Sequence, residues 1–168
     1  MAERPIVKYG DPILREISQP VDSVDQTVKD LVSDMVDTLK KAQGLGLAAV
    51  QIGVRKRVFI VDLSAVDLKA TLKVFINPEI IGTNGEVELE EGCLSFPGIY
   101  QRIIRPASVR VRAMDINGQT FELEANGLGA RAILHEFDHL EGKLFIDYIS
   151  PIARTLLKGR LKKLAAAS

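Results

Sequence analysis

The sequence predicts an α+β fold in a single domain, residues 1–168, with short antiparallel strands around one central helix. Three observations support this prediction. A chain of 168 residues is long enough for one domain with one sizeable core. Segments with a three- to four-residue apolar period are interspersed with shorter runs rich in Val, Ile and Phe. One Asn-Gly pair stands between two such runs, which is the signal of a tight antiparallel hairpin.

The first expected helix covers residues 23–43. Its apolar residues recur at steps of three and four and form one stripe: Val28, Leu31, Val32, Met35, Val36 and Leu39. Ser23 and Gln26 predict a capping box at the start of this helix, and Gly44 predicts its end. We therefore expect an N-terminal helix with one buried face.

Strands are expected after a small, glycine-rich segment that spans residues 44–51. Five segments are dense in β-branched and aromatic residues or alternate apolar with polar ones: residues 57–63, 73–81, 86–89, 109–113 and 120–125. Asn117-Gly118 is the predicted turn between the last two. A short meander of antiparallel strands follows from this pattern.

Two more helices complete the prediction. The central helix covers residues 128–141, between Gly127 or Gly129 and Gly142. The C-terminal helix, residues 151–168, begins at Pro151, a residue that fits the first helical turn.

The overall charge excludes some classes of partner. Lys+Arg and Asp+Glu both number 22, so no net field attracts DNA or an anionic membrane. No apolar run is long enough to span a bilayer, and the N-terminus lacks the apolar stretch of a secretory signal. Cys93 is the only cysteine, which fits a reducing compartment. We expect a cytoplasmic protein with no membrane and no DNA partner.

The most informative motif is His135-Glu-Phe-Asp-His139 in the predicted central helix, which contains the only two histidines of the chain. Residues at i and i+4 of a helix point the same way, so both imidazoles can reach one metal ion. Glu136 lies about 100° around the helix from His135, so it can approach a metal-bound water without binding the metal. We predict His135 and His139 as metal ligands and Glu136 as the general base of a hydrolase.

A third ligand is needed, because a catalytic metal usually takes three protein ligands and keeps one position for water. No further histidine follows, and Glu141 and Asp147 lie too close to the helix end to be persuasive. A lone cysteine is most often a buried structural residue. Beside a two-histidine helix, however, Cys93 becomes the best candidate, because Gly92 before it lets the backbone approach closely.

The glycine-rich segment 44–51 could suggest phosphate binding. Dinucleotide sites, however, place the glycines after a strand and before a helix, whereas here the order is helix, glycines, strand. Close approach of the backbone to a substrate explains these glycines better.

Taken together, three motifs resemble the peptide deformylase family. They are Gly44-Leu-Gly-Leu-Ala-Ala-Val-Gln51, Glu91-Gly-Cys-Leu-Ser95 and His135-Glu-Phe-Asp-His139, in the order that the family has. The resemblance spans about residues 7–150 and implies a metal-dependent hydrolase that removes the formyl group from the N-terminal methionine of nascent chains.

The resemblance also implies roles for individual residues. The side-chain amide of Gln51 and the backbone N–H of Leu94 are expected to bind the formyl oxygen. A second set is expected to line the peptide groove and methionine pocket: Leu45, Gly46, Leu89, Gly92, Leu128, Arg131 and Ala132. For Leu89 and Leu128 taken singly, plain core packing is an equal alternative. Leu128, Ala132 and His135 fall on one helix face, which would place the pocket beside the metal.

The donor set leaves several metals open. One thiolate and two imidazoles suit Zn²⁺, Fe²⁺, Co²⁺ or Ni²⁺. The resemblance implies Fe²⁺ as the active metal, one ion per chain, with zinc, nickel or cobalt in some preparations.

The C-terminal segment carries five basic residues without an acidic one: Arg154, Lys158, Arg160, Lys162 and Lys163. An amphipathic helix packed on the domain accounts for them. The resemblance suggests in addition a contact with the ribosome through this helix. Organellar relatives share the motifs, so an organellar origin stays open beside the cytoplasmic one.

Two other functions compete with deformylation. A metallopeptidase could use the same helix motif on internal peptide bonds, although the chain is short for that class. An inactive or metal-storing protein that binds nascent chains is the non-enzymatic alternative. Glu136 and Gln51 argue against it, because chemistry needs them and metal binding does not.

Overall fold

The computed structural model describes residues 2–64, 67 and 69–167. The helices are α1 (Gln26–Ala42), α2 (Gly127–Leu140) and α3 (Pro151–Ala166), with short 3-10 helices η1 (Pro12–Arg15), η2 (Ala49–Ile52) and η3 (Phe145–Tyr148). The strands are β1 (Gly46–Ala48), β2 (Val58–Val61), β3 (Lys73–Asn84), β4 (Val87–Gly92), β5 (Tyr100–Arg105), β6 (Ser108–Met114) and β7 (Thr120–Asn126). The α+β prediction is confirmed.

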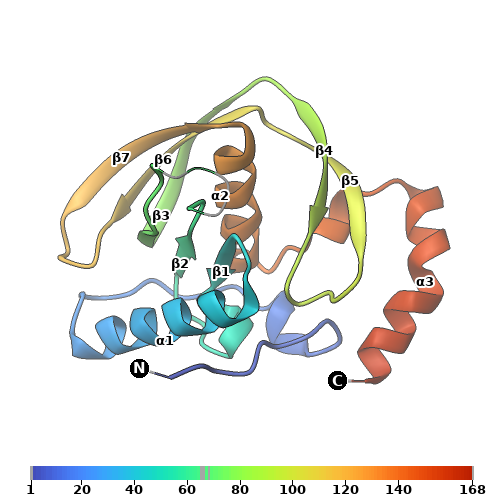
Figure 1. Cartoon of the computed structure of the whole chain (residues 1–168), viewed down its shortest axis with the longest axis horizontal. Coiled ribbons are helices and arrows are strands. Elements are labelled where there is room, and N and C mark those ends of the chain that lie inside the picture. Colours follow the sequence, from blue (N-terminus) through green and yellow to red (C-terminus); the bar gives the residue numbers. More distant parts are fainter. Residues whose placement is uncertain (1, 65–66, 68, 168) are drawn as a thin grey trace.

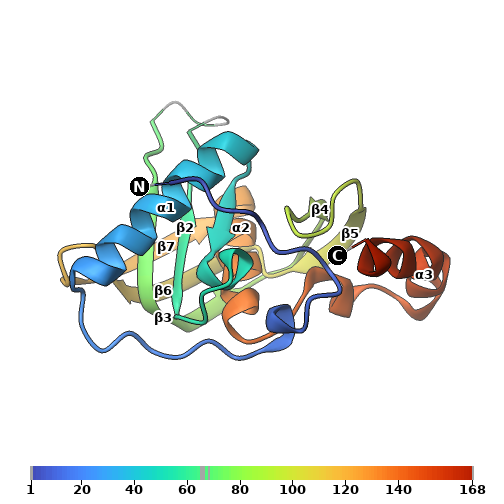
Figure 2. The same cartoon turned by 90° about the horizontal axis from the view of Figure 1, so that it is seen from below.

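The strands form two separate units. Five of them make an antiparallel sheet in the order β1-β2-β3-β6-β7, and β4 pairs with β5 alone. The long strand β3 runs on into β4 and β5 runs on into β6, so the β4–β5 ribbon extends from the sheet as a bent arm (Figure 1). Helix α2 lies between the sheet and this ribbon, and α3 lies beyond the ribbon (Figures 1 and 2).

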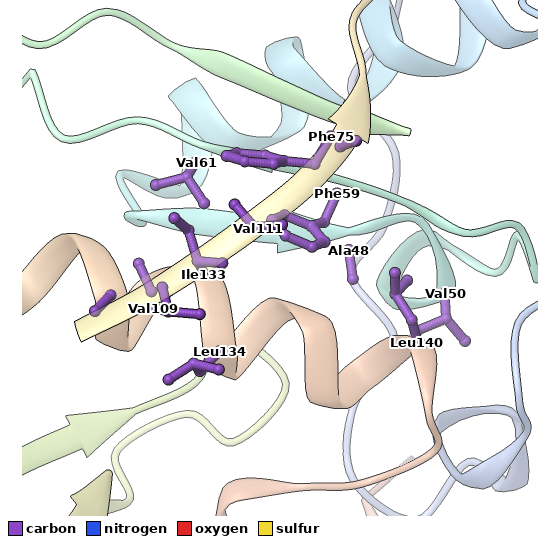
Figure 3. Close-up of a cluster of buried hydrophobic side chains, with 13 residues drawn as sticks. Ala48, Val50, Phe59, Val61, Phe75, Val109, Val111, Ile133, Leu134 and Leu140 are labelled. Atoms are coloured by element: carbon purple, nitrogen blue, oxygen red, sulfur yellow. The ribbon is translucent and has the colours of Figure 1, made fainter. Parts of the chain in front are cut away.

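Strand β2 separates two layers of the core because its successive side chains point to opposite faces of the sheet. Phe59 and Val61 belong to the same buried cluster as Ile133 and Leu134 of α2, and Figure 3 shows Ile133 turned toward this face of the sheet. Val58 and Ile60 face the other way. They pack against the apolar stripe of α1 predicted from the sequence. All four residues of β2 are buried, so the sheet is covered on both faces here.

A third core fixes the ribbon and α3 to the rest of the molecule. Phe96, Ile103, Phe145, Leu157 and Leu161 are all buried in it. The ring of Phe145 meets that of Phe96 edge to face, with centroids 5.0 Å apart. This cluster supports the chain segment that carries Cys93, which packs at its edge.

The ends of the predicted elements need some corrections. Helix α1 starts at Gln26 because the Asp25 carboxylate, not Ser23, accepts a hydrogen bond from the N–H of Val28. It ends at Ala42, and the next residue, Gln43, takes the left-handed conformation one residue before the predicted Gly44. Strands β1 and β5 were not predicted. Strand β1 has only three residues, and in β5 the polar residues Gln101 and Arg102 interrupt the apolar pattern. The hairpin at Asn117-Gly118 is confirmed.

Candidate metal centre and active site

Helix α2 is buried over most of its length because it lies between the sheet and the ribbon. Its N-cap Asn126 is extended and Gly127 has φ +55°, so the chain turns sharply from β7 into the helix. Nine of its residues are buried, and four of these are polar: Arg131, His135, Glu136 and His139. Buried polar side chains need partners or a function. These four therefore mark the helix as the centre of the site.

The predicted metal ligands lie together in the structure. The donor atoms of Cys93, His135 and His139 are all within 4.8 Å of one another. Cys93 Sγ is 3.5 Å from Nε2 of His139, and the two imidazole centroids are 5.1 Å apart. One soft thiolate and two imidazoles in such a cluster fit a four-coordinate transition-metal ion with one position left for water.

His135 is oriented by a buried carboxylate. Its Nδ1 lies 2.5 Å from Oε2 of Glu91, so Nε2 is the nitrogen left for a metal. A carboxylate behind a metal-binding histidine fixes the ring and its tautomer. Sequence reasoning gave Glu91 no role, although it stands only two residues before Cys93 in the motif.

The two histidines differ in their electrostatics. Burial lowers the pKa of His139, and the nearby positive charge of His135 lowers it further. Burial also acts to lower the pKa of His135, but the negative charges of Cys93 and Glu136 outweigh it and raise that pKa. The charges that hold a proton on His135 would equally attract a metal cation, which takes the place of that proton.

Glu136 lies beside this cluster without belonging to it. It is 4% exposed, and burial raises the pKa of its carboxyl to about 7. Its Oε1 is buried and has no hydrogen-bond partner within the described part of the chain. Gly46 of β1 lies against it: a Cβ there would be 2.7 Å from Oε2 of Glu136. The absence of a side chain at Gly46 therefore leaves space for the Glu136 carboxylate beside the cavity that Gly46 lines.

The amide of Gln51 has a defined orientation. Its Oε1 accepts a hydrogen bond from the N–H of Ala48 at 2.9 Å. Its Nε2 consequently points to Ser95 Oγ at 3.1 Å and toward Cys93 Sγ at 3.6 Å. Leu94 follows Cys93 in a turn closed by the bond from Phe96 N–H to the Cys93 carbonyl, and its own N–H has no acceptor among the described residues. Two donors thus lie beside the cysteine.

A cavity of about 440 Å³ opens over this centre. Eleven of the predicted site residues line it: Leu45, Gly46, Gln51, Gly92, Cys93, Leu94, Leu128, Arg131, Ala132, His135 and Glu136. His139 is 1% exposed and does not line it. Leu89 does not line it either: it lies on β4 and is 39% exposed.

Two cavity features were not expected. Tyr100, at the start of β5, is half exposed and lines the cavity, and its ring packs on Gly92, where a Cβ would be 2.6 Å away. Arg131 lines the cavity but is almost fully buried. Its guanidinium donates to Glu91 and to the carbonyls of Val87 and Ile103, so it fixes the ribbon to α2.

Known proteins resemble this chain over nearly its whole length. A family model described as polypeptide deformylase matches residues 3–155. Peptide deformylase 1 of Burkholderia multivorans is 47% identical over 168 residues, which cover 99% of this chain and 92% of the relative. A peptide deformylase from Legionella pneumophila superposes with a TM-score of 0.90 at 44% identity, covering 96% of this chain and 95% of that one. The Ehrlichia chaffeensis enzyme in complex with actinonin gives 0.89 at 39% identity, over 97% and 98%.

Proposed function

Because the chain belongs to the polypeptide deformylase family, a family of metal-dependent hydrolases that remove the formyl group from the N-terminal methionine of nascent polypeptides, we propose which of its residues perform that reaction. The observation that carries the proposal is the convergence of the Cys93, His135 and His139 donor atoms within 4.8 Å, beside a buried glutamate and under a cavity.

Cys93, His135 and His139 would hold one divalent metal ion. When bound, such an ion polarises a carbonyl oxygen and makes water a nucleophile near neutral pH. Glu91 keeps His135 in the orientation that presents Nε2. Fe²⁺ is the proposed active metal, and Zn²⁺, Ni²⁺ or Co²⁺ would fit the same donors. Metal analysis of anaerobically purified protein tests this choice, and a preparation that is fully active without iron would contradict it.

Glu136 would move the protons. Its unpartnered Oε1 accepts a proton from the attacking water, and the carboxyl then delivers that proton to the nitrogen that leaves. Burial raises the pKa of Glu136 to about 7, so the same carboxyl can act first as a base and then as an acid at neutral pH. Gly46 keeps the space that this carboxylate occupies.

Gln51 Nε2 and the N–H of Leu94 would donate hydrogen bonds to the formyl oxygen as it gains negative charge. The bond from Ala48 to the other end of the amide holds the Gln51 donor in place before substrate arrives. Such preorganised donors are worth about 3–4 kcal/mol of barrier each.

The peptide would bind in an extended form between two unpaired strand edges. β1 is the edge of the five-stranded sheet, and β4 pairs with β5 on one side only. Main-chain bonding of this kind tolerates many sequences, whereas a pocket selects the side chain. Leu45, Gly46 and Gly92 border this groove, and Leu128 and Ala132 offer an apolar pocket for methionine, with Arg131 holding its wall. For Leu89 we retain only a contact at the outer end of the groove.

The site favours deformylation over the competing peptidase reaction. The cysteine ligand comes from upstream of the helix, and Gln51 supplies an oxyanion donor beside it. Incubation with formyl-Met-Ala-Ser and with its unformylated counterpart separates the two reactions. We expect formate from the first peptide and no cleavage of the second; shortening of either peptide chain would refute the proposal.

We further propose that α3 contacts the ribosome, in the cytoplasm or its organellar equivalent. All five basic residues of the helix are exposed, whereas Leu157 and Leu161 are buried against the domain. Exposed basic residues on one helix suit the phosphate backbone of RNA, and such binding weakens as salt rises. Salt-sensitive co-sedimentation with ribosomes, lost when residues 154–168 are deleted, is expected. Equal co-sedimentation of the truncated protein would contradict it. Among the described helices, none is both long and apolar enough to cross a membrane.

A further inference from the structure

One buried arginine outside the cavity contacts both halves of the metal centre. Arg105 ends strand β5 and is only 4% exposed. Its Nε and Nη2 each donate to one oxygen of Glu91 at 2.7 Å. Its Nη1 donates to Asp138 Oδ2 at 2.9 Å, and the ring of Tyr148 lies 5.0 Å from the guanidinium. Three donors and one face of this side chain are therefore engaged.

The two acids that Arg105 binds stand next to the proposed metal ligands. Glu91 is bound to His135 and lies two residues before Cys93 in the same chain segment. Asp138 directly precedes His139 in α2. The Arg105 guanidinium is thus connected to each of the three proposed metal ligands through a single acid: to His135 and Cys93 through Glu91, and to His139 through Asp138.

This arrangement matters because the ligands come from separate units. Cys93 follows the end of strand β4 in the ribbon, whereas both histidines belong to α2. Their mutual distances depend on how the ribbon is seated against the helix. Arg131 also donates to Glu91, and it holds the two strands against α2 through the carbonyls of Val87 and Ile103. Arg105 in addition joins Glu91 to Asp138, the acid beside His139.

We propose that Arg105 is a positioning residue that sets the geometry of the metal centre by joining Glu91 of the ribbon to Asp138 of the metal-binding helix. The proposal rests on the metal site proposed above. A guanidinium is suited to this task because its planar fork binds one carboxylate with two parallel bonds and still offers a donor on its other edge. Arg105 and Arg131 together pair with Glu91 and Asp138, so the charges of these two acids are compensated.

Arg105→Lys tests the proposal, because it keeps the charge but cannot make the forked contact and the bridge together. Co²⁺ serves as the probe: its affinity is measured by competition with a chelator, and its absorption spectrum reports the ligand geometry. We expect Co²⁺ affinity to fall about 10- to 100-fold, as for other partners of metal ligands, with a changed spectrum. We expect kcat to fall while KM for formyl-Met-Ala-Ser stays within about twofold, since Arg105 does not line the cavity.

Arg102→Lys is the matched control. Arg102 lies on the same strand, its side chain is 62% exposed, and its contact with Glu88 is at the surface. This variant is expected to match the wild type in affinity, spectrum and rate. A purely structural role for Arg105 would lower the unfolding temperature and leave the spectrum and affinity of the folded protein unchanged.

An Arg105→Lys protein with wild-type affinity and spectrum would overturn the proposal. If that variant does not fold, Asp138→Asn decides, because it weakens only the helix side of the bridge; an unchanged Co²⁺ spectrum and affinity there would likewise overturn the proposal. Failure of the wild-type protein to bind one Co²⁺ would refute the metal site itself.

Discussion

Gly46→Ala tests whether the position of the Glu136 carboxylate controls catalysis. The added Cβ would lie 2.7 Å from Oε2, 2.9 Å from Cγ and 3.1 Å from Cδ of Glu136. The shortest of these distances is about 0.7 Å inside the 3.4 Å at which ordinary contact begins. Because all three atoms belong to one side chain, the carboxylate has to swing away.

The size of this shift sets the expected loss. A misplacement of about 1 Å in a reacting group can reduce the rate about 100-fold, equivalent to roughly 2.7 kcal/mol of barrier. We expect kcat for formyl-Met-Ala-Ser to fall by about 30- to 100-fold. The metal content should not change, because the three atoms nearest to the added Cβ all belong to Glu136 and none to Cys93, His135 or His139.

Gly82→Ala is the control for this experiment. Gly82 also lies in a strand, and a Cβ there meets nothing within 4 Å. Its rate should stay within about twofold of the wild type, as for other surface changes. A Gly46→Ala protein that retains the wild-type kcat, or that loses metal together with activity, would show that the position of the Glu136 carboxylate does not control the rate in this way.

Three more predictions concern the same site and the fold. Glu136→Gln should keep the metal and lower kcat by about 10²- to 10⁴-fold, since the amide cannot accept the proton that the buried carboxylate takes from water. Steady-state formate release with metal analysis measures this, and an active variant would remove Glu136 from that role. Cys93→Ser should weaken Zn²⁺ binding in a chelator competition, because a hydroxyl is a poorer ligand than a thiolate, and unaltered affinity would exclude the cysteine as a ligand. Asp147→Asn should lower the free energy of unfolding at pH 7 by about 0.5–1.5 kcal/mol, since Asp147 loses its paired bonds from Arg15. Burial acts to raise the pKa of Asp147, but the hydrogen bonds from Arg15 and Leu144 outweigh it and lower that pKa below its ordinary value. The contribution of the Asp147 carboxylate to stability is therefore present above about pH 4 and disappears as the pH falls through the lowered pKa. Urea unfolding of both proteins at pH 7 and pH 3 should therefore show a difference that shrinks in acid, and a difference that grows would be inconsistent with this sign.

Local patterns predicted most of the fold. The stripe on α1 and the Asn117-Gly118 turn are signals between near neighbours, and the structure confirms both. Strand β5 was missed because Gln101 and Arg102 interrupt its apolar pattern, and Arg105 at its end is buried by partners from two other elements. Such a partner 14 residues away in sequence leaves no periodic signal.

The candidate site divides in the same way. The four-residue spacing of His135 and His139 places both side chains on the same face of one helix, so a shared metal could be predicted from sequence alone. The position of Cys93 beside them depends on how the ribbon is seated against α2, which no short pattern encodes. The sequence showed Glu91 as part of a motif but did not predict its role. That role depends on contacts with Arg105, Arg131 and His135, which form only when the chain is folded.

X-ray absorption at the metal edge of the zinc-loaded protein tests the central claim most directly. We expect one sulfur at about 2.3 Å and two imidazole nitrogens at about 2.0–2.1 Å from the metal, with one further oxygen from water. The sulfur should disappear in Cys93→Ser. A shell of nitrogen and oxygen alone in the wild-type protein, or a single imidazole, would contradict the assignment of Cys93, His135 and His139 as the metal ligands.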